Sequence, residues 1–313
     1  MNFSKYSKIE EFILLGLSSK RNIQIVLFVV FLTCYIISLT GNITIITLSR
    51  ISSRLQNPMY FFLSNLSFLD IWLTSSIVPQ MLIHFLSVRK SISFNGCVTQ
   101  MFIALTLGGT ECYLLSSMAY DRYVAICAPL HYTNIMHPVL CIKMAICSWI
   151  GGLVNSLIHT VFAMQLPYCN SNVINDFFCE VPSVLELACV DISLNRTVLF
   201  LFTIIIVIGP FFFILITYGY IISSILKIST SSGRKKAFST CASHITVVSL
   251  FYGTIIFMYM RPGSSHVANK DKRASLFYSV ITPMLNPLIY TLRNKDVTGA
   301  LRDITRKKVV SDK

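Results

Sequence analysis

The sequence predicts an all-α membrane protein, a bundle of seven transmembrane helices with an extracellular N-terminus. Of its 313 residues, 54% are hydrophobic and only 12% are charged, about half the charged share of an average soluble chain. The mean hydropathy is +0.67. The charges form short clusters between apolar stretches of about 20 residues, the length that a helix needs to cross a bilayer. Hydrocarbon cannot satisfy backbone polar groups, so these long apolar runs predict helices, whereas barrel strands would show alternation.

Seven apolar segments lie between successive charged clusters. The third contains Glu111 in its middle, and the first is too long for the hydrophobic region of a cleaved signal peptide. The expected spans are Ile23–Leu48, Pro58–Leu86, Cys97–Tyr120, Leu140–Phe162, Val198–Leu226, Ala237–Met260 and Ala274–Leu292. We therefore expect an extracellular N-terminal tail over residues 1–22, a seven-helix domain over 23–292 and a cytoplasmic C-terminal tail over 293–313.

Three features predict the orientation of this bundle. With the N-terminus outside, 15 of the 26 Lys and Arg residues fall on the inner face and 11 outside, in agreement with the positive-inside rule. Asn2-Phe3-Ser4 is a glycosylation sequon in the external tail, with Asn2 the expected glycan site. Cys169, Cys179 and Cys189 fall in a long loop in the oxidising compartment. The sequence thus predicts a multi-pass protein of the plasma membrane.

The distribution of charge disfavours a nucleic-acid partner, and the spacing of histidine and cysteine disfavours a metal-centred enzyme. The net charge of +13 includes the basic clusters Arg234–Lys236 and Arg306–Lys308, which we expect to contact anionic membrane lipid. A nucleic-acid partner would need a soluble basic surface, and none is predicted. The six histidines and ten cysteines form neither CxxC nor HExxH spacing, which disfavours a metal-centred enzyme.

Four cysteines are expected on the outer side: Cys97 at the start of the third span, and Cys169, Cys179 and Cys189 in the long loop. Unpaired thiols are uncommon in an oxidising compartment, so we expect disulfides. Four cysteines allow three pairings, and their spacing leaves the choice open. The other six lie in the membrane or at its inner face and should stay reduced.

Two carboxylates, Asp70 and Glu111, lie inside apolar spans. Ionisable groups there cost several kcal/mol and are functional by default. They could form a proton relay, a cation site, or a polar lock joined by amides such as Asn42 and Asn286. No basic residue lies mid-span to neutralise either acid, so a protonated carboxyl or a bound cation is needed. That requirement favours a cation site.

Several motifs carry a family resemblance. Asp121-Arg122-Tyr123, a lone Trp149 in the fourth span and Asn286–Tyr290 in the seventh resemble the rhodopsin-like class of G-protein-coupled receptors. Within that class, four stretches resemble the signatures of odorant (olfactory) receptors of the tetrapod-type branch. They are Leu55–Asp70 (LQNPMYFFLSNLSFLD), Met118–Tyr132 (MAYDRYVAICAPLHY), Lys236–His244 (KAFSTCASH) and Pro283–Val297 (PMLNPLIYTLRNKDV).

The resemblance implies roles for particular residues. Cys97 would bond to Cys179, and Cys169 to Cys189. Arg122 would be restrained at rest and freed on activation to face a heterotrimeric G protein of the stimulatory olfactory type, which raises cyclic AMP. The implied switch residues are Asp121, Arg122, Tyr123, Tyr218, Asn286, Pro287 and Tyr290. Asp70, Glu111 and Asn286 would hold a sodium ion at rest, and no other cofactor is expected.

The ligand pocket is expected between the outer halves of the third, fifth and sixth helices, since bundle ligands bind between helices. No carboxylate precedes Glu111 on the third helix, so amines are disfavoured, and the seventh span has no lysine to hold retinal. A small, neutral, largely hydrophobic odorant fits best. The candidate residues are Phe102, Ala104, Leu105, Gly108, Gly109, Phe202, Thr203, Ile206, Val207, Tyr252, Ile255, Ile256, Tyr259 and Ser279. Each could instead fill a helix contact, and Gly108 and Gly109 could permit close helix packing.

Two other functional classes remain as alternatives. A transporter or channel would predict inverted repeats, interrupted helices or a polar pore stripe, and no repeat is visible. A membrane enzyme would need a nucleophile with a base, whereas His159 and His244 are isolated in the sequence. We therefore expect a receptor and no enzyme activity.

Overall fold

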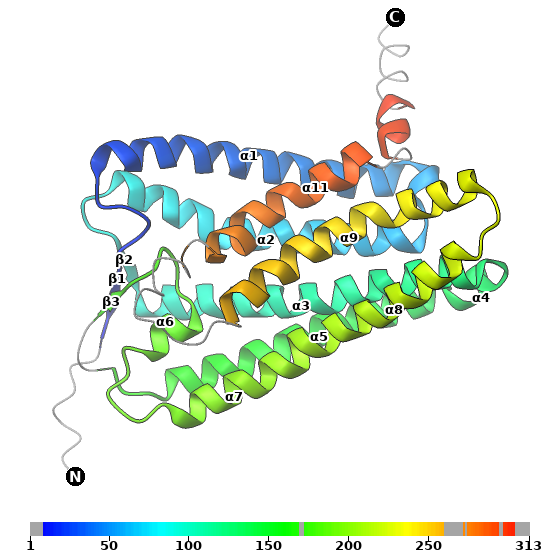
Figure 1. The fold of residues 1–313 in the computed structure, drawn as a ribbon. Coiled ribbons are helices and arrows are strands. Elements are labelled where there is room, and N and C mark those ends of the chain that lie inside the picture. The colour runs from blue at the N-terminus through cyan, green and yellow to red at the C-terminus, as the bar shows by residue number, and fades with distance from the viewer. Residues whose placement is uncertain (1–8, 169–171, 260–271, 273, 294–296, 304–313) are drawn as a thin grey trace, which may run out of the picture.

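The protein is described by a computed structural model, which covers residues 9–168, 172–259, 272, 274–293 and 297–303. Figure 1 shows long helices side by side in one bundle, with a small sheet at one end. The long elements are α1 (Arg21–Ile51), α2 (Pro58–Leu86), α3 (Phe94–Cys127), α5 (Pro138–Met164), α7 (Ser193–Thr203) with η4 (Ile204–Ile208) and α8 (Gly209–Leu226), α9 (Ser231–Tyr259), and η5 (Phe277–Ile281) with α11 (Thr282–Arg293). The shorter ones are η2 (Ser53–Leu55), η3 (Pro129–His131), α4 (Tyr132–Ile135) and α6 (Val181–Leu185).

The bundle confirms the predicted fold class. Among the described residues, six helical segments are long and apolar enough to cross a membrane, and η5 with α11 adds a further helix that packs on α1, α2 and α9. The observed α2 has the predicted bounds, whereas α3 extends past its predicted span at both ends. It extends because helix ends follow capping groups as well as hydropathy: the Ser93 hydroxyl accepts a hydrogen bond from the Gly96 N–H at 3.1 Å.

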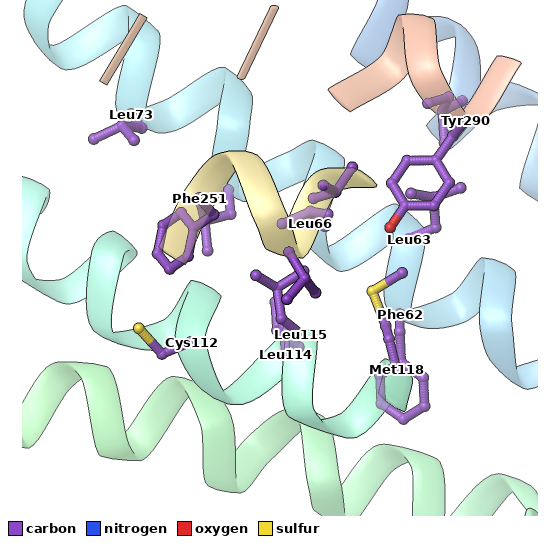
Figure 2. Close-up of a cluster of buried hydrophobic side chains, with 14 of the residues drawn as sticks. Phe62, Leu63, Leu66, Leu73, Cys112, Leu114, Leu115, Met118, Phe251 and Tyr290 are labelled. Atoms are coloured by element: carbon purple, nitrogen blue, oxygen red, sulfur yellow. The ribbon is translucent and has the colours of Figure 1, made fainter. Parts of the chain in front are cut away.

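The core of the bundle is formed where α3 meets its neighbours. Figure 2 shows side chains of α2, α3, α9 and α11 converging on one buried cluster, among them Leu66, Leu115, Phe251 and Tyr290. Close approach of α3 to α5 depends on glycine. A Cβ added to Gly152 would lie 2.8 Å from the backbone nitrogen of Thr110, and one added to Gly109 would lie 3.2 Å from the Cα of Gly152. Small residues let helix backbones approach closely in membranes.

A proline in the seventh helix is compensated by the first helix. Pro287 has no N–H, so the carbonyl of Pro283, one turn earlier, lacks its usual partner. The side-chain amide of Asn42 donates to that carbonyl at 3.1 Å, and the Ser38 hydroxyl donates to it at 3.3 Å. Both donors lie on α1. The interior polar residues of α1 therefore serve a specific helix contact, and a Cβ at Gly41 would meet the Pro287 ring at 2.9 Å.

Part of the predicted N-terminal tail forms a strand. β1 (Glu11–Leu14) lies between β2 (Ser91–Ser93), with which it pairs antiparallel, and β3 (Val173–Ile174), with which it pairs parallel. Its side chains alternate, with Phe12 and Leu14 buried in a cluster that also contains Cys97 and Cys179. No strand was predicted here from the sequence, because a four-residue strand is stable only once it pairs with partners distant in sequence.

Candidate functional site

The two ends of the bundle are chemically different. One end, here called the disulfide end, carries the three-stranded sheet and the Cys97–Cys179 bond between the start of α3 and the loop before α6. The other, the Arg122 end, carries the last turns of α3 and the short helix α4. The residues of the predicted ligand pocket lie toward the disulfide end, and Arg122 of the predicted switch lies at the other end.

A cavity of about 130 Å³ lies beneath the loop at the disulfide end. It is bounded by α3, α5, α7, η4, α9 and η5, by the loop that follows β3, and by the first residue of α6. Most of its surface is apolar. Its lining consists of Met101, Ala104, Leu105, Gly108, Gly109, Cys112, Asn155, His159, Phe178, Cys179, Glu180, Val181, Leu199, Phe202, Thr203, Ile206, Val207, Phe251, Ile255 and Tyr278.

Most of the candidate pocket residues line this cavity. Those that do are Ala104, Leu105, Gly108, Gly109, Phe202, Thr203, Ile206, Val207 and Ile255. The two glycines differ: a Cβ on Gly108 would meet nothing within 4 Å, whereas Gly109 lies against α5. Gly108 thus leaves open space, and Gly109 also serves helix packing. The π-helical turn η4 places both Ile206 and Val207 on the cavity wall, as such turns often do at functional sites.

Four candidate residues lie outside this lining: Phe102, Tyr252, Ile256 and Ser279. Phe102 follows Met101 and is turned by about 100° around the helix. Tyr252 is buried beside Phe211, with ring centroids 4.8 Å apart. The Ser279 hydroxyl donates to the carbonyl of Ser275 at 2.6 Å. The side chain of Tyr259 lies outside the described residues, so its place in the pocket stays a prediction.

Four polar residues of the cavity were not predicted from the sequence. Asn155 and His159 come from α5, which was not expected to contribute, and the ring of His159 lies edge-on to Phe202 at 5.4 Å. Glu180 comes from the loop and Tyr278 from η5. One signal was available for Glu180: it follows Cys179, whose bond to Cys97 holds the loop over the bundle.

Asp70 and Asn286 meet in the middle of the bundle. The side-chain amide of Asn286 donates to Asp70 Oδ2 at 3.0 Å. Glu111 is also buried and interacts electrostatically with Asp70. Each of these three residues has one buried oxygen without a hydrogen-bond partner: Asp70 Oδ1, Glu111 Oε1 and Asn286 Oδ1. The site therefore combines two acids with one amide. Within the described part of the chain, no group of three or more His, Cys, Asp or Glu side chains is placed so that it could hold a metal ion.

Asp121 holds Arg122 at the far end of α3. The guanidinium forms an ion pair with the adjacent carboxylate and donates from Nε to Asp121 Oδ2 at 3.0 Å. The other carboxylate oxygen accepts a hydrogen bond from the Tyr132 hydroxyl at 2.7 Å. Burial and the neighbouring Asp121 carboxylate raise the pKa of Tyr132, so this phenol remains a donor at neutral pH. Asp121 is fully buried, and its charge is balanced by Arg122.

Tyr218 and His244 form a second polar contact near Arg122. The Tyr218 hydroxyl lies 2.6 Å from His244 Nδ1, and His244 Nε2 lies 3.1 Å from the carbonyl oxygen of Leu115. A carbonyl only accepts, so Nε2 carries the proton and Nδ1 accepts from the tyrosine. This contact joins α8 and α9 to α3. Arg122 acts electrostatically on both Tyr218 and Tyr290.

The structure also describes the other residues of the predicted switch. The Tyr290 hydroxyl is buried without a hydrogen-bond partner, the ring of Tyr123 lies 6.0 Å from that of Tyr220, and Pro287 packs on Gly41. The predicted Cys97–Cys179 bond is present. Cys189 is disulfide-bonded, but Cys169 lies outside the described residues, and with it the predicted Cys169–Cys189 bond. Asn2 lies outside them as well.

Comparison with known proteins gives one consistent result. Residues 31–308 match the family described as olfactory receptor. Human olfactory receptor 2C3 is 51% identical over 302 residues, which covers 96% of this chain and 94% of that protein. The dog olfactory receptor-like protein OLF1 is 51% identical over 98% of both chains. Mouse olfactory receptor 2C1 is 50% identical over 96% of both chains.

Proposed function

Because the chain belongs to the olfactory receptor family, we propose that it binds a small, neutral, largely hydrophobic odorant in the cavity at the disulfide end. On binding, it activates a stimulatory heterotrimeric G protein of the olfactory type, which raises cyclic AMP. Membership of the family makes it a multi-pass membrane receptor and not an enzyme, and the transporter and channel alternatives are set aside.

The observation that carries the proposal is the cavity itself. Its wall is mainly aliphatic and aromatic, with a few polar groups contributed by several elements, which is typical of a site for a small apolar ligand. Within this lining the helices contribute no carboxylate, and Glu180 of the loop is the acidic group. A largely apolar ligand of a few heavy atoms would fit a volume of about 130 Å³.

The proposed orientation places the disulfide end outside the cell and the Arg122 end in the cytoplasm. Support comes from the disulfide, which forms in oxidising compartments. The basic residues Arg234, Lys235 and Lys236 begin α9 on the opposite side, as the positive-inside rule requires. In this orientation Arg122 faces the G protein and the anionic inner leaflet lies against the basic residues.

The cavity proposal predicts a specific mutational effect. Gly108→Leu is expected to abolish or strongly weaken the cyclic AMP response to every agonist, because the new side chain enters open space in the cavity. The measurement is cyclic AMP in cells that express the receptor and the olfactory G protein, screened with volatile neutral compounds. Gly219→Leu is the matched control, since this exposed α8 glycine also has nothing within 4 Å of its added Cβ. Unchanged agonist potency in Gly108→Leu at equal surface expression would contradict the pocket.

We also propose that Asp70, Glu111 and Asn286 hold a sodium ion in the resting receptor. The three unpartnered oxygens support this assignment, because hard cations take carboxylate and carbonyl oxygen ligands. When bound, the ion supplies the positive charge that the two acids lack.

The sodium proposal predicts a salt-specific effect on stability. The melting temperature of the purified receptor should rise by a few degrees in sodium chloride relative to choline chloride, about 2–4 °C for each kcal/mol of binding. Asp70→Asn should remove that difference, because it takes away one charged ligand. Asp191→Asn, at an exposed loop position, should retain it. Equal melting temperatures of the unmodified receptor in both salts would refute sodium binding.

A further inference from the structure

We infer that His159 and Asn155 of α5 bind the polar end of the ligand, and that they favour neutral molecules with a carbonyl group, such as ketones, aldehydes and esters. This inference rests on the proposed pocket and deepens it by naming a ligand class. Both side chains line the cavity. They lie one helical turn apart on α5, where residues four apart share a face, so they form one pair of polar groups in a mainly apolar wall.

Both side chains are buried and keep their hydrogen-bonding capacity for a ligand. His159 is 4% exposed and Asn155 is 8% exposed. Among the residues that the structure describes, neither side chain forms a hydrogen bond or an ion pair with the protein. Most buried polar side chains have a partner. Two that line a cavity without one therefore indicate where the polar group of a bound molecule lies.

Other polar side chains near the pair already use their protons within the protein. The Ser156 hydroxyl, next to Asn155 on α5, donates to the carbonyl of Phe102 at 2.6 Å. Across the cavity wall, the Thr203 hydroxyl donates to the carbonyl of Leu199 at 2.8 Å. The donors that remain for a ligand on this part of the wall are those of His159 and Asn155.

Contacts with apolar neighbours fix the position of the pair. The ring of His159 lies edge-on to Phe202, with centroids 5.4 Å apart. The amide of Asn155 lies beside α3, since a Cβ added to Gly109 would be 3.6 Å from Asn155 Nδ2. Phe202 and Gly109 line the cavity as well. Polar groups that are held by packing present a defined direction to a ligand.

The chemistry of the pair determines the ligand group that fits it. A neutral imidazole has one N–H donor in either tautomer, and a side-chain amide has two. A carbonyl oxygen has two lone pairs, so this one ligand atom can accept from both side chains. A hydrocarbon of the same shape accepts from neither, and it would exclude water from both and leave buried donors unsatisfied. An alcohol oxygen also accepts, but its own proton then needs a further acceptor.

The rest of the lining suits a hydrocarbon body. Leu105, Val207 and Ile255 contribute aliphatic surface, and Gly108 leaves open space beside them. The favoured molecule is therefore small and apolar with a carbonyl group at one end. Carbonyl compounds should rank above the matched alcohols, and the alcohols above the matched hydrocarbons.

The test compares molecules that differ only in this group. Cyclic AMP dose–response curves are measured for heptan-2-one, for heptan-2-ol and for 2-methylhept-1-ene, in which a methylene group replaces the carbonyl oxygen, and for equivalent sets built on aldehydes and esters. The ketone should be about tenfold more potent than the alkene. His159→Phe and Asn155→Leu, which keep much of the side-chain volume, should each lower ketone potency about tenfold. The potency of any active alkene should stay equal or rise, because an unsatisfied donor has been removed.

Controls separate this role from a structural one. Thr160→Val changes the neighbour of His159, whose buried hydroxyl oxygen also has no hydrogen-bond partner but lies outside the described lining. This variant should preserve the ratio of ketone to alkene potency. His159→Gln retains a donor and should keep more of the ketone preference than His159→Phe does. Surface expression is matched for every variant.

Three results would overturn the inference: alkenes as potent as the matched ketones, alcohols more potent than the ketones, or an equal loss of ketone and alkene potency in both His159→Phe and Asn155→Leu. A receptor that responds to hydrocarbons or alcohols but not to carbonyl compounds keeps the proposed function and loses this inference. Silence toward every volatile neutral compound of the screen counts against both.

Discussion

Cys179→Ser is expected to remove most of the folded receptor from the cell surface. The Cys97–Cys179 bond joins residues 82 apart in sequence, and closing a loop of that length stabilises a fold by about 4.5 kcal/mol in the chain-entropy model. Both cysteines are buried in the same cluster as Phe12 and Leu14. The backbone N–H of Cys179 also donates to the Gln100 side chain at 2.9 Å. Without the disulfide, the loop would no longer be held where this hydrogen bond can form.

The expected loss extends to ligand binding, because Phe178, Glu180 and Val181 next to the bond line the cavity. The measurement is surface labelling of an N-terminal epitope on intact cells, together with total expression. Cys147→Ser provides the matched control, because Cys147 is a free, exposed cysteine on α5. Normal surface levels and normal agonist potency in Cys179→Ser would show that the loop is held by its other contacts alone.

Arg122→Ala is expected to abolish the cyclic AMP response while leaving the cavity intact. Arg122 lies far along α3 from Met101 and Gly108, and its guanidinium is the charged group balanced by Asp121 within the bundle. A guanidinium can exchange one set of partners for another, and in the proposed function it leaves Asp121 to face the G protein. Removing the guanidinium takes away its proposed contact with the G protein in the active state.

The effect of Arg122→Ala is checked at matched surface expression with an agonist from the odorant screen. Removal of the partner also leaves the Asp121 carboxylate buried with its hydrogen bond from the Tyr132 hydroxyl but without a balancing charge, so a loss of stability is expected as well. For that reason agonist binding is measured alongside cyclic AMP. Arg54→Ala should behave normally, because its ion pair with Asp303 is exposed and such pairs contribute about 0–1 kcal/mol. A full cyclic AMP response from Arg122→Ala would contradict the proposed switch.

The helical bundle could be predicted from sequence because its signals are local. Apolar length, the proline at the first turn of α2 and the capping side chain of Asn57 all act within a few residues. The same locality explains why the wall of the cavity on α3 was largely foreseen. Positions Leu105, Gly108 and Cys112 follow helical spacing along one face, and a helix keeps that spacing wherever it packs.

Other parts of the fold, and the loop side of the cavity, were decided by contacts between distant segments. β1 exists because Glu11–Leu14 finds Ser91–Ser93 and Val173–Ile174 as partners. Glu180 reaches the cavity because the disulfide holds the loop over the bundle, and Ser275 and Tyr278 hold its carboxylate there. No property of residues 178–182 by themselves specifies these partners.

The sequence by itself therefore determined the class of fold, the family and the face that α3 presents to the cavity, because hydropathy and helical period act over a few turns of chain. Only the tertiary structure decided which distant groups meet: Asn42 with the carbonyl of Pro283, Asn286 with Asp70, and Glu180 with Tyr278. The physical reason is that a polar side chain buried in a bundle takes the nearest available partner, and that partner is set by how whole helices pack against one another.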